Sequence, residues 1–444
     1  MRRVLVIAYY FPPMGLSGVQ RIAKFVKYLP HYGWQPTVLT VYPGKYFAYD
    51  TSLLREVEAS GAEIIRTATL DPLRLLAGTQ GQLKRPLQMP SERLRRLWTI
   101  VNGWLFVPDN KIGWLPLAVR AGEAMLKQHR FEVLFASSPP PTALLIGARL
   151  QQKSHLPFVV DYRDDWLENP RQLFPTRWHR WLHARLERYV LRRATCAITI
   201  NTTLARQLSK RLPGDKGAPI VIPHGFDPED FENAPILPRS PKRLRLLYAG
   251  VFYDAQQPDD FFQGLAQWLG QQPEAREHVE AVFIGLQPPH VPQRVAQLGL
   301  NDIVRFEGYR SHPETIAALK TADVLWMTVG EQPGAAGIST SKLFEYIGSR
   351  KPILALVPEG EARTLLQEYG AAYLAPPHDV PAIACALARI YTDWKAQRLP
   401  QGKAEVVNRH SRRLLTRHLA EVFTMACQRH EKLLTHAVSV AHSQ

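Results

Sequence analysis

The sequence predicts an α/β protein made of two doubly wound parallel-sheet domains. Short apolar runs recur along the whole chain with amphipathic segments between them, which is typical of alternating strands and helices. The 444 residues are also too many for one ordinary hydrophobic core. Because crossovers between parallel strands are almost always right-handed, this alternation favours parallel sheets with helices on both faces.

The first half opens with a strand at residues 4–10, a glycine-containing turn, and a helix at residues 19–31 that Gly33 ends. Gly15 and Gly18 leave backbone amides free where this helix starts, and an anion binds well to such amides; a tight turn without a ligand is the alternative. A dinucleotide fingerprint would need a third glycine and a later acidic residue, which this stretch lacks. Further strands are predicted at residues 37–41, 132–136, 158–162, 195–200 and 219–223, and a long basic helix at residues 177–193.

The second half repeats the alternation. Strands are predicted at residues 244–249, 279–284, 303–307, 323–329, 352–357 and 372–374. We therefore expect a first domain at residues 1–226, a linker rich in proline and acidic residues at 227–243, and a second domain at 244–403. A basic amphipathic tail helix is expected within residues 404–444.

Positive charge is concentrated in the first half. The chain has a net charge of +16, and the residues up to His224 hold 32 Lys and Arg against 15 Asp and Glu, whereas the rest hold 23 against 24. A basic first half favours a polyanionic partner, such as an anionic membrane surface, a phosphorylated lipid acceptor or nucleic acid. Three scattered cysteines without metal-ligand spacing, and an apolar start without a cleavage site, favour a cytoplasmic protein.

Residues 71–112 depart from this alternation and indicate an insertion in the first domain. Basic residues precede two tryptophans and an apolar run that is too short to span a bilayer. This pattern predicts a basic amphipathic helix lying in a membrane interface, and the alternative is a helix packed on the domain's own flank. The residues concerned are Lys84, Arg85, Arg93, Arg95, Arg96, Trp98 and Trp104.

Residues 334–358 form the strongest candidate binding stretch, and they predict a flexible loop, a short helix and a buried strand. A cation in the first turn of a helix is disfavoured by the helix dipole, and a bound phosphate or diphosphate would reverse that penalty. A carboxylate one turn later can accept two hydrogen bonds from a ribose diol, whereas the alternative is an ordinary Lys–Glu pair on the surface. The candidate residues are Ser339, Thr340, Ser341, Lys342 and Glu345.

A second cluster follows the predicted strand at residues 158–162. Asp161, Arg163 and Asp164 come at its carboxyl end, where parallel sheets place their ligand sites. Charged side chains are costly in a core and natural at a site, so all three are candidate catalytic residues. The alternative is an Arg–Asp network that pins a loop.

Three stretches resemble family 4 glycosyltransferases of the GT-B fold. They are Tyr-Tyr-Phe-Pro-Pro with Ser-Gly-Val-Gln-Arg near the start, Asp-x-Arg-Asp-x-Trp from Asp161, and Lys-Leu-Phe-Glu-Tyr from Lys342. The resemblance implies two Rossmann-like domains facing across a cleft and a tail helix that crosses back to the first domain. It also implies that Glu345 holds the ribose of a nucleotide sugar. Gly337 replaces a glutamate found in much of the family.

The loops after the strands of the second domain complete the predicted donor site. Gly250 and Tyr253 follow its first strand, where many relatives carry two cations and this chain carries none before Pro258. Lys342, together with Arg310, would therefore supply the positive charge for the diphosphate, and Tyr309 would stack on the base.

The resemblance implies a glycosyltransferase for surface polysaccharide or glycolipid assembly. A sugar would move with retention from a UDP- or GDP-linked donor to a glycan or lipid-linked acceptor, at the inner face of the cytoplasmic membrane. No metal is expected, because no Asp-x-Asp or His/Cys cluster lies near the predicted site. Two alternatives are a sugar-nucleotide epimerase of the same fold and a non-catalytic sugar- or polyanion-binding protein. Nucleic acid is not expected as a partner, because no recognition motif is present.

Overall fold

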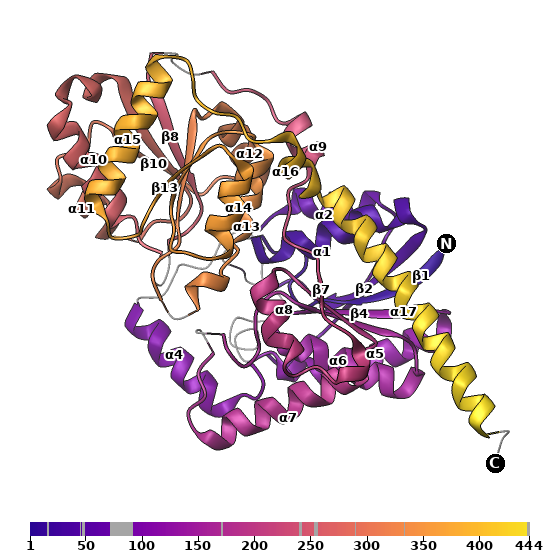
Figure 1. The fold of residues 1–444 in the computed structure, drawn as a ribbon. Coiled ribbons are helices and arrows are strands. Elements are labelled where there is room, and N and C mark those ends of the chain that lie inside the picture. Colours follow the sequence, from indigo (N-terminus) through magenta and orange to yellow (C-terminus); the bar gives the residue numbers. More distant parts are fainter. Residues whose placement is uncertain are drawn as a thin grey trace. The chain divides into compact units, whose positions relative to one another are not determined.

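A computed structural model describes residues 1–15, 17–44, 46, 49–71, 92–169, 172–238, 242–252, 256–288, 290–332 and 334–441. The chain forms two compact units (Figure 1). The first unit comprises Met1–Pro223 with Leu415–Gln444, and the second comprises His224–Leu414. Several predicted positions lie outside the described residues: Tyr253, Lys84 and Arg85, and the side chains of Arg93, Arg95 and Arg96.

The first unit contains a seven-stranded parallel sheet in the order β3-β2-β1-β4-β5-β6-β7. Its central strands are buried on both faces, as their continuous apolar runs predict. The edge strand β3 was not predicted, because all its residues are only half-buried and no apolar run marks it. The strands are β1 (Arg2–Ile7), β2 (Trp34–Val41), β3 (Glu63–Thr67), β4 (Val133–Ser138), β5 (Phe158–Tyr162), β6 (Cys196–Thr199) and β7 (Ile220–Val221).

Helices cover both faces of this sheet (Figure 1). The helices of the first unit are α1 (Ser17–Tyr28), α2 (Thr51–Ala59), α4 (Glu92–Leu105), α5 (Leu115–Gln128), α6 (Pro141–Ser154), α7 (Arg177–Arg193) and α8 (Thr202–Ser209), with short 3-10 helices at Leu29–Tyr32, Ile112–Trp114 and Gly214–Lys216. Of these, α4 lies away from the sheet (Figure 1). The helix predicted at residues 177–193 is confirmed. Gly33, which ends the 3-10 helix Leu29–Tyr32 that follows α1, has a left-handed conformation with φ +80°, which a side chain would disfavour.

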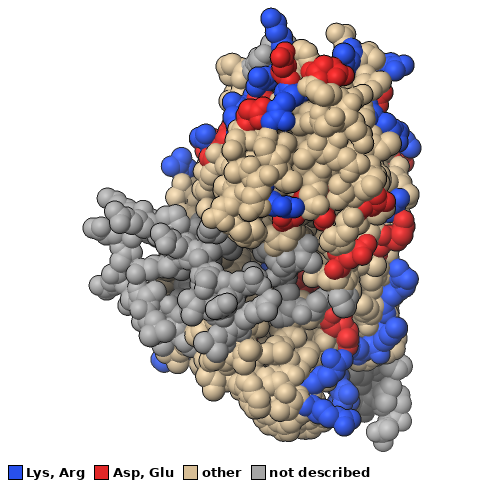
Figure 2. All heavy atoms as spheres, turned by 90° about the vertical axis from the view of Figure 1, so that its left-hand side faces the viewer, with Lys and Arg blue, Asp and Glu red and all other residues tan. Residues whose placement is uncertain are grey.

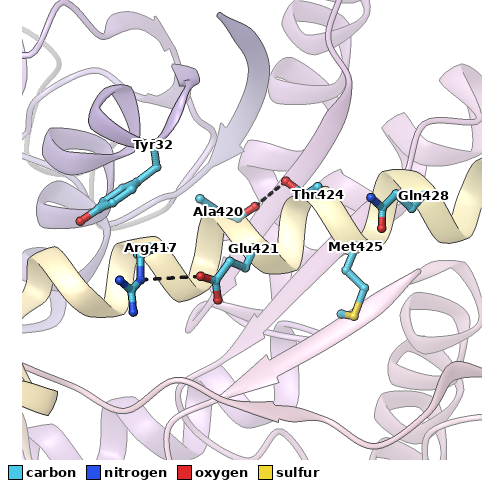
Figure 3. Close-up of a pocket in the computed structure, with 7 residues that line it drawn as sticks. All are labelled: Tyr32, Arg417, Ala420, Glu421, Thr424, Met425 and Gln428. Atoms are coloured by element: carbon cyan, nitrogen blue, oxygen red, sulfur yellow. Dashed lines mark hydrogen bonds and ion pairs between the residues drawn. The ribbon is translucent and has the colours of Figure 1, made fainter.

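The long carboxyl-terminal helix α17 (Arg412–Ala441) packs on the first unit from Leu415 onward. Phe423 is fully buried there, with its ring edge-on to both Trp34 and Phe135 at centroid distances of 5.3 Å. A cavity of about 360 Å³ lies along the outer side of this helix, lined by Tyr32, Arg417, Ala420, Glu421, Thr424, Met425 and Gln428 (Figure 3). Its one pair of opposite charges, Arg417 and Glu421, is already joined at 3.6 Å, so nothing about this cavity suggests chemistry.

The second unit contains a six-stranded parallel sheet in the order β10-β9-β8-β11-β12-β13. All six strands were predicted. They are β8 (Leu244–Ala249), β9 (Val279–Ile284), β10 (Val304–Gly308), β11 (Val324–Thr328), β12 (Ile353–Leu356) and β13 (Ala372–Ala375). The two parallel sheets confirm the predicted fold class.

The helices of the second unit alternate with its strands. They are α9 (Pro228–Asn233), α10 (Asp259–Gln271), α11 (His290–Gln297), α12 (His312–Thr321), α13 (Ser341–Gly348), α14 (Glu361–Tyr369), α15 (Val380–Lys395) and α16 (Ala404–Arg409), with 3-10 helices at Pro273–His278 and Ala335–Gly337. The linker expected at residues 227–243 contains the short helix α9. The Asp227 side chain accepts from the Glu229 amide and starts that helix. Residues 404–414, expected with the tail, belong to the second unit.

Each sheet has a point where successive connections leave in opposite directions. In the first unit this point lies between β1 and β4, and in the second between β8 and β11. Loops that follow such strands leave an opening at the carboxyl edge of the sheet, where open α/β proteins bind their ligands. Among the described residues, no helix is long and apolar enough to cross a membrane.

Candidate functional site

Helix α13 starts beside the switch point of the second sheet. The loop after β11 leads through Gly334, with φ +82°, into the 3-10 helix and then to Thr340, the residue before the first turn. The Ala249 amide at the end of β8 donates to the Tyr346 hydroxyl oxygen at 2.9 Å, which holds α13 against that strand. The predicted loop and helix are therefore confirmed, and the helix start lies next to the loop that follows β8.

Lys342 turns toward this neighbouring loop. Its Nζ lies 3.7 Å from the centroid of the Tyr248 ring, a cation–π contact. A Cβ added at Gly250 would lie 2.7 Å from Lys342 Cε and Nζ, and Gly250 has φ +146°, a backbone conformation that favours glycine. Burial lowers the pKa of the Lys342 ammonium to about 7, and the negative charge of Glu345 opposes that shift. A desolvated cation at a helix start is well placed to gain from a bound anion.

Ser339, Thr340 and Ser341 are half-buried in the segment that enters α13. Thr340 is the N-cap residue of α13, but its hydroxyl makes no capping hydrogen bond. The Thr340 Oγ1 atom is buried and, within the described part of the chain, has no hydrogen-bond partner. A buried hydroxyl of this kind costs free energy unless something binds it.

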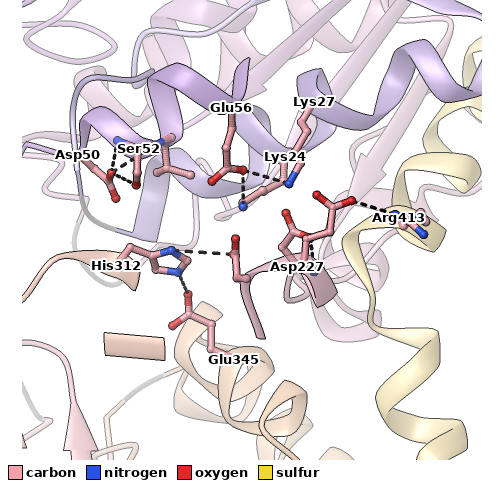
Figure 4. A network of polar contacts seen from close by, with 12 residues as sticks. Lys24, Lys27, Asp50, Ser52, Glu56, Asp227, His312, Glu345 and Arg413 are labelled. Carbon is pink, nitrogen blue, oxygen red and sulfur yellow. Dashed lines mark hydrogen bonds and ion pairs between the residues drawn. The ribbon is translucent and has the colours of Figure 1, made fainter. Parts of the chain in front are cut away.

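Glu345 lies one turn after Lys342 and is mostly buried. Its Oε1 lies 3.0 Å from His312 Nε2, and His312 Nδ1 lies 3.9 Å from a carboxylate oxygen of Asp230 (Figure 4). The sequence did not point to His312, because a single histidine at the start of α12 carries no motif. Its position there is set by Ser311 and Glu314, which form a capping box.

The remaining predicted donor residues lie farther along the sheet. Tyr309 and Arg310 follow β10, which is the edge strand and is separated from β8 by β9. Both are exposed, and Arg310 lies 3.6 Å from Glu307. Tyr253 lies outside the described residues. The structure thus brings Gly250, Lys342 and Glu345 together and leaves Tyr309 and Arg310 on a neighbouring loop.

Asp161 is a buried structural residue in the first unit. It has no exposed surface, and it binds Arg21 of α1 through two hydrogen bonds of 3.0 and 3.1 Å. Ser137 donates to the same carboxylate at 2.7 Å. The burial of Asp161 and its three hydrogen bonds favour the Arg–Asp network that was the alternative to the predicted catalytic role. Arg21 itself also donates to the Pro223 carbonyl at 2.8 Å.

Arg163 joins the loops at the carboxyl edge of the first sheet. Its guanidinium donates to the carbonyls of Ser138, Pro139 and Gly18, at 3.2 Å and 2.7 Å for the first two. Burial lowers the pKa of Arg163, and Asp161 opposes the shift. The arginine thus fixes the glycine turn at the start of α1, which includes the predicted Gly15 and Gly18. Asp164 is the exposed member of the cluster predicted after β5.

Two family models match the chain. Residues 18–225 match a glycosyl transferase 4-like domain, and residues 243–393 match glycosyl transferases group 1. These spans follow one another and together cover most of the sequence. No curated protein sequence matches the chain.

Solved structures share the fold along almost the whole chain. Sucrose-phosphate synthase from Thermosynechococcus elongatus is 15% identical, with a TM-score of 0.58 over 99% of this chain and 100% of that one. The Anabaena protein HepE, in complex with UDP and glucose, is 14% identical, with a TM-score of 0.55 over 98% and 100%. WaaG, a glycosyltransferase involved in lipopolysaccharide biosynthesis, is 15% identical, with a TM-score of 0.55 over 95% and 99%. With its two matched domains on this fold, the chain belongs to the glycosyltransferases, as a 4-like domain followed by a group 1 domain of the GT-B type.

Proposed function

We propose that the enzyme transfers a sugar from a nucleotide-diphosphate sugar, UDP- or GDP-linked, to a glycan or lipid-linked acceptor. The observation that carries this proposal is the start of α13, where Lys342 stacks on Tyr248 and reaches across Gly250 at the switch point of the sheet. Backbone amides, the Thr340 hydroxyl and a desolvated lysine are groups that can bind the oxygens of a diphosphate.

Each donor residue then has a distinct role. Lys342 and the α13 amides stabilise the negative charge that develops on the leaving diphosphate, and this chemistry needs no metal. Glu345 accepts two hydrogen bonds from the ribose diol, and His312, 3.0 Å away, orients its carboxylate. In the first unit, Asp164 meets the acceptor or the donor sugar, while Arg163 positions the surrounding loops.

The acceptor side of the proposal draws on the relatives and on the charge of the first unit. HepE was solved with UDP and glucose, and WaaG acts in lipopolysaccharide biosynthesis. We place this enzyme in surface polysaccharide or glycolipid assembly, in the cytoplasm and at the inner face of an anionic membrane. Transfer with retention of the anomeric configuration belongs to the same proposal, and nuclear magnetic resonance of the first-formed product tests it.

Substitution of Glu345 tests the donor site. Glu345→Ala should weaken UDP or GDP binding by about 1.5–3 kcal/mol, because a charged bidentate contact is lost. Calorimetric titration measures this, and Glu359→Ala is the matched control, because Glu359 is an exposed glutamate of the same unit, paired with Arg363. Equal affinities of the Glu345→Ala variant and the parent protein would remove Glu345 from the site.

Incubation with a nucleotide sugar and no acceptor distinguishes a glycosyltransferase from an epimerase. A glycosyltransferase should hydrolyse the nucleotide sugar slowly, whereas an epimerase would convert it to an epimer.

A further inference from the structure

We infer that the first unit carries a docking surface for an anionic lipid bilayer, formed by the second half of α4 and the solvent-facing side of α7. The inference rests on the proposed function, since it names where the enzyme meets the membrane that holds a lipid-linked acceptor. The surface itself is defined by contacts within the first unit. We call it the α4–α7 surface.

Helix α7 presents a stripe of tryptophan and arginine to solvent. Positions 178, 181, 185, 188 and 192 are spaced by three and four residues, so they share one face of the helix. Trp178 and Trp181 are 59% and 55% exposed, and the three positions that follow are exposed arginines. The single acidic residue of this helix, Glu187, is buried on the other side, 3.0 Å from Arg211. The exposed face therefore carries the two tryptophans near its start, beside the exposed Arg177, and arginines alone toward its end.

Helix α4 extends the apolar end of this stripe. Ile100, Trp104 and Leu105 are 47%, 54% and 68% exposed. The helix is held in place by close contacts: a Cβ added at Gly103 would lie 3.3 Å from Leu173, in the segment that leads into α7. The Trp104 ring also meets His179 of α7 edge-on, at a centroid distance of 5.4 Å. The two helices therefore form one fixed surface.

Large apolar side chains gathered next to arginines fit a bilayer interface. Tryptophan prefers the headgroup region, where its ring is apolar and its N–H is wet, and arginine binds anionic headgroups. The Arg185 guanidinium lies 5.6 Å from the Trp181 ring centroid, so the cationic and apolar parts adjoin. Figure 2 shows, at the height of α7, uncharged surface with Lys and Arg side chains at its edge. The same charge on α7 argues for anionic over neutral lipid.

Vesicle flotation tests the inference with the full chain. The protein should float with phosphatidylcholine vesicles that contain phosphatidylglycerol. Its affinity for vesicles of pure phosphatidylcholine should be about tenfold lower. Trp178→Ser with Trp181→Ser, and separately Arg185→Gln with Arg188→Gln, should each weaken binding to anionic vesicles by about tenfold or more. All four positions are exposed, so thermal unfolding should be unchanged. A double variant that unfolds early is replaced by its single substitutions, Trp181→Ser or Arg188→Gln, each with a smaller loss of binding.

The matched control removes the same charge from another helix of the first unit. Arg206 of α8 and Lys210, which follows it, are exposed, and Arg206→Gln with Lys210→Gln should leave binding within about twofold of the parent. Equal loss in this control, full binding in both surface variants, or no binding by the parent protein would each overturn the inference. Nucleotide affinity is measured on the same samples without vesicles. A parent protein that binds nucleotide but no vesicles would therefore refute the surface and leave the proposed function standing. A parent protein that binds vesicles through this surface but binds no nucleotide would refute the function alone.

Discussion

Neighbouring residues at the end of β5 have different environments although they share one stretch of sequence. Asp161 points into the first unit and is enclosed by Arg21 and Ser137, whereas Asp164 is exposed. A fully buried ion pair costs much of its Coulomb energy in desolvation, and removing one partner leaves a charge without compensation. The two carboxylates should therefore respond to substitution in opposite ways.

Asp161→Asn should lower the free energy of unfolding by about 3–5 kcal/mol, because Arg21 would keep its buried charge without its partner. Asp164→Asn should change stability by less than about 0.5 kcal/mol, as is usual for an exposed position, and should lower kcat. Urea denaturation and a transfer assay on both variants measure these effects. A stable Asp161→Asn protein, or an Asp164→Asn enzyme with full turnover, would contradict the assignment.

At the scale of a single element, the first turn of α13 joins the fold to the proposed chemistry. Tyr346 fixes the helix to β8, and Gly250 leaves room for Lys342. Because burial lowers the pKa of Lys342 to about 7, the free protein holds this side chain partly neutral at neutral pH. A bound diphosphate favours the charged form and so raises that pKa.

Nucleotide binding above pH 7 should therefore take up a proton, and affinity should fall as pH rises from about 7 toward 10. Calorimetry in two buffers with different ionisation enthalpies measures the uptake, which Lys342→Met should abolish. Without ligand, the unfolded chain binds more protons at this lysine between pH 7 and its ordinary pKa. Its contribution to the free energy of unfolding should therefore rise with pH across that window. Proton release on binding would contradict this account.

Elements with long apolar runs were predictable from the sequence, and elements set by tertiary position were not. Strands such as β5 and β8 carry continuous apolar residues and were predicted with the bounds that the structure shows. The half-buried edge strand β3 and the short α9, which depends on one Asp227 cap, leave weak patterns. In the site, Lys342 and Glu345 belong to one helix and were found together. His312 comes from a distant helix, so no local pattern could join it to Glu345.

At the scale of the whole molecule, each unit has its own core, and the first is completed by the other end of the chain. Phe423 of α17 fits between Trp34 and Phe135 in the first unit. In the second unit, Phe261 of α10 stacks on Trp326 at a centroid distance of 4.0 Å. Both phenylalanines are fully buried.

Phe423→Ala should destabilise the first unit by about 3–5 kcal/mol, and Phe261→Ala should do the same to the second. Calorimetry should resolve two unfolding transitions. Each variant should lower the midpoint temperature of a different transition, because a cavity destabilises the core that contains it. Added nucleotide should raise only the transition that Phe261→Ala lowers. A single transition shifted equally by both variants would show that the two cores unfold as one.

Helix α17 has a consequence for biosynthesis. The ribosome must translate the entire second unit before Leu415 and the residues after it are made. The apolar sheet face around Trp34 and Phe135 therefore remains exposed while nearly half of the polypeptide is translated. We therefore expect the nascent amino-terminal half to rely on chaperones during that interval, and a stop codon placed just before α17 to yield aggregated protein.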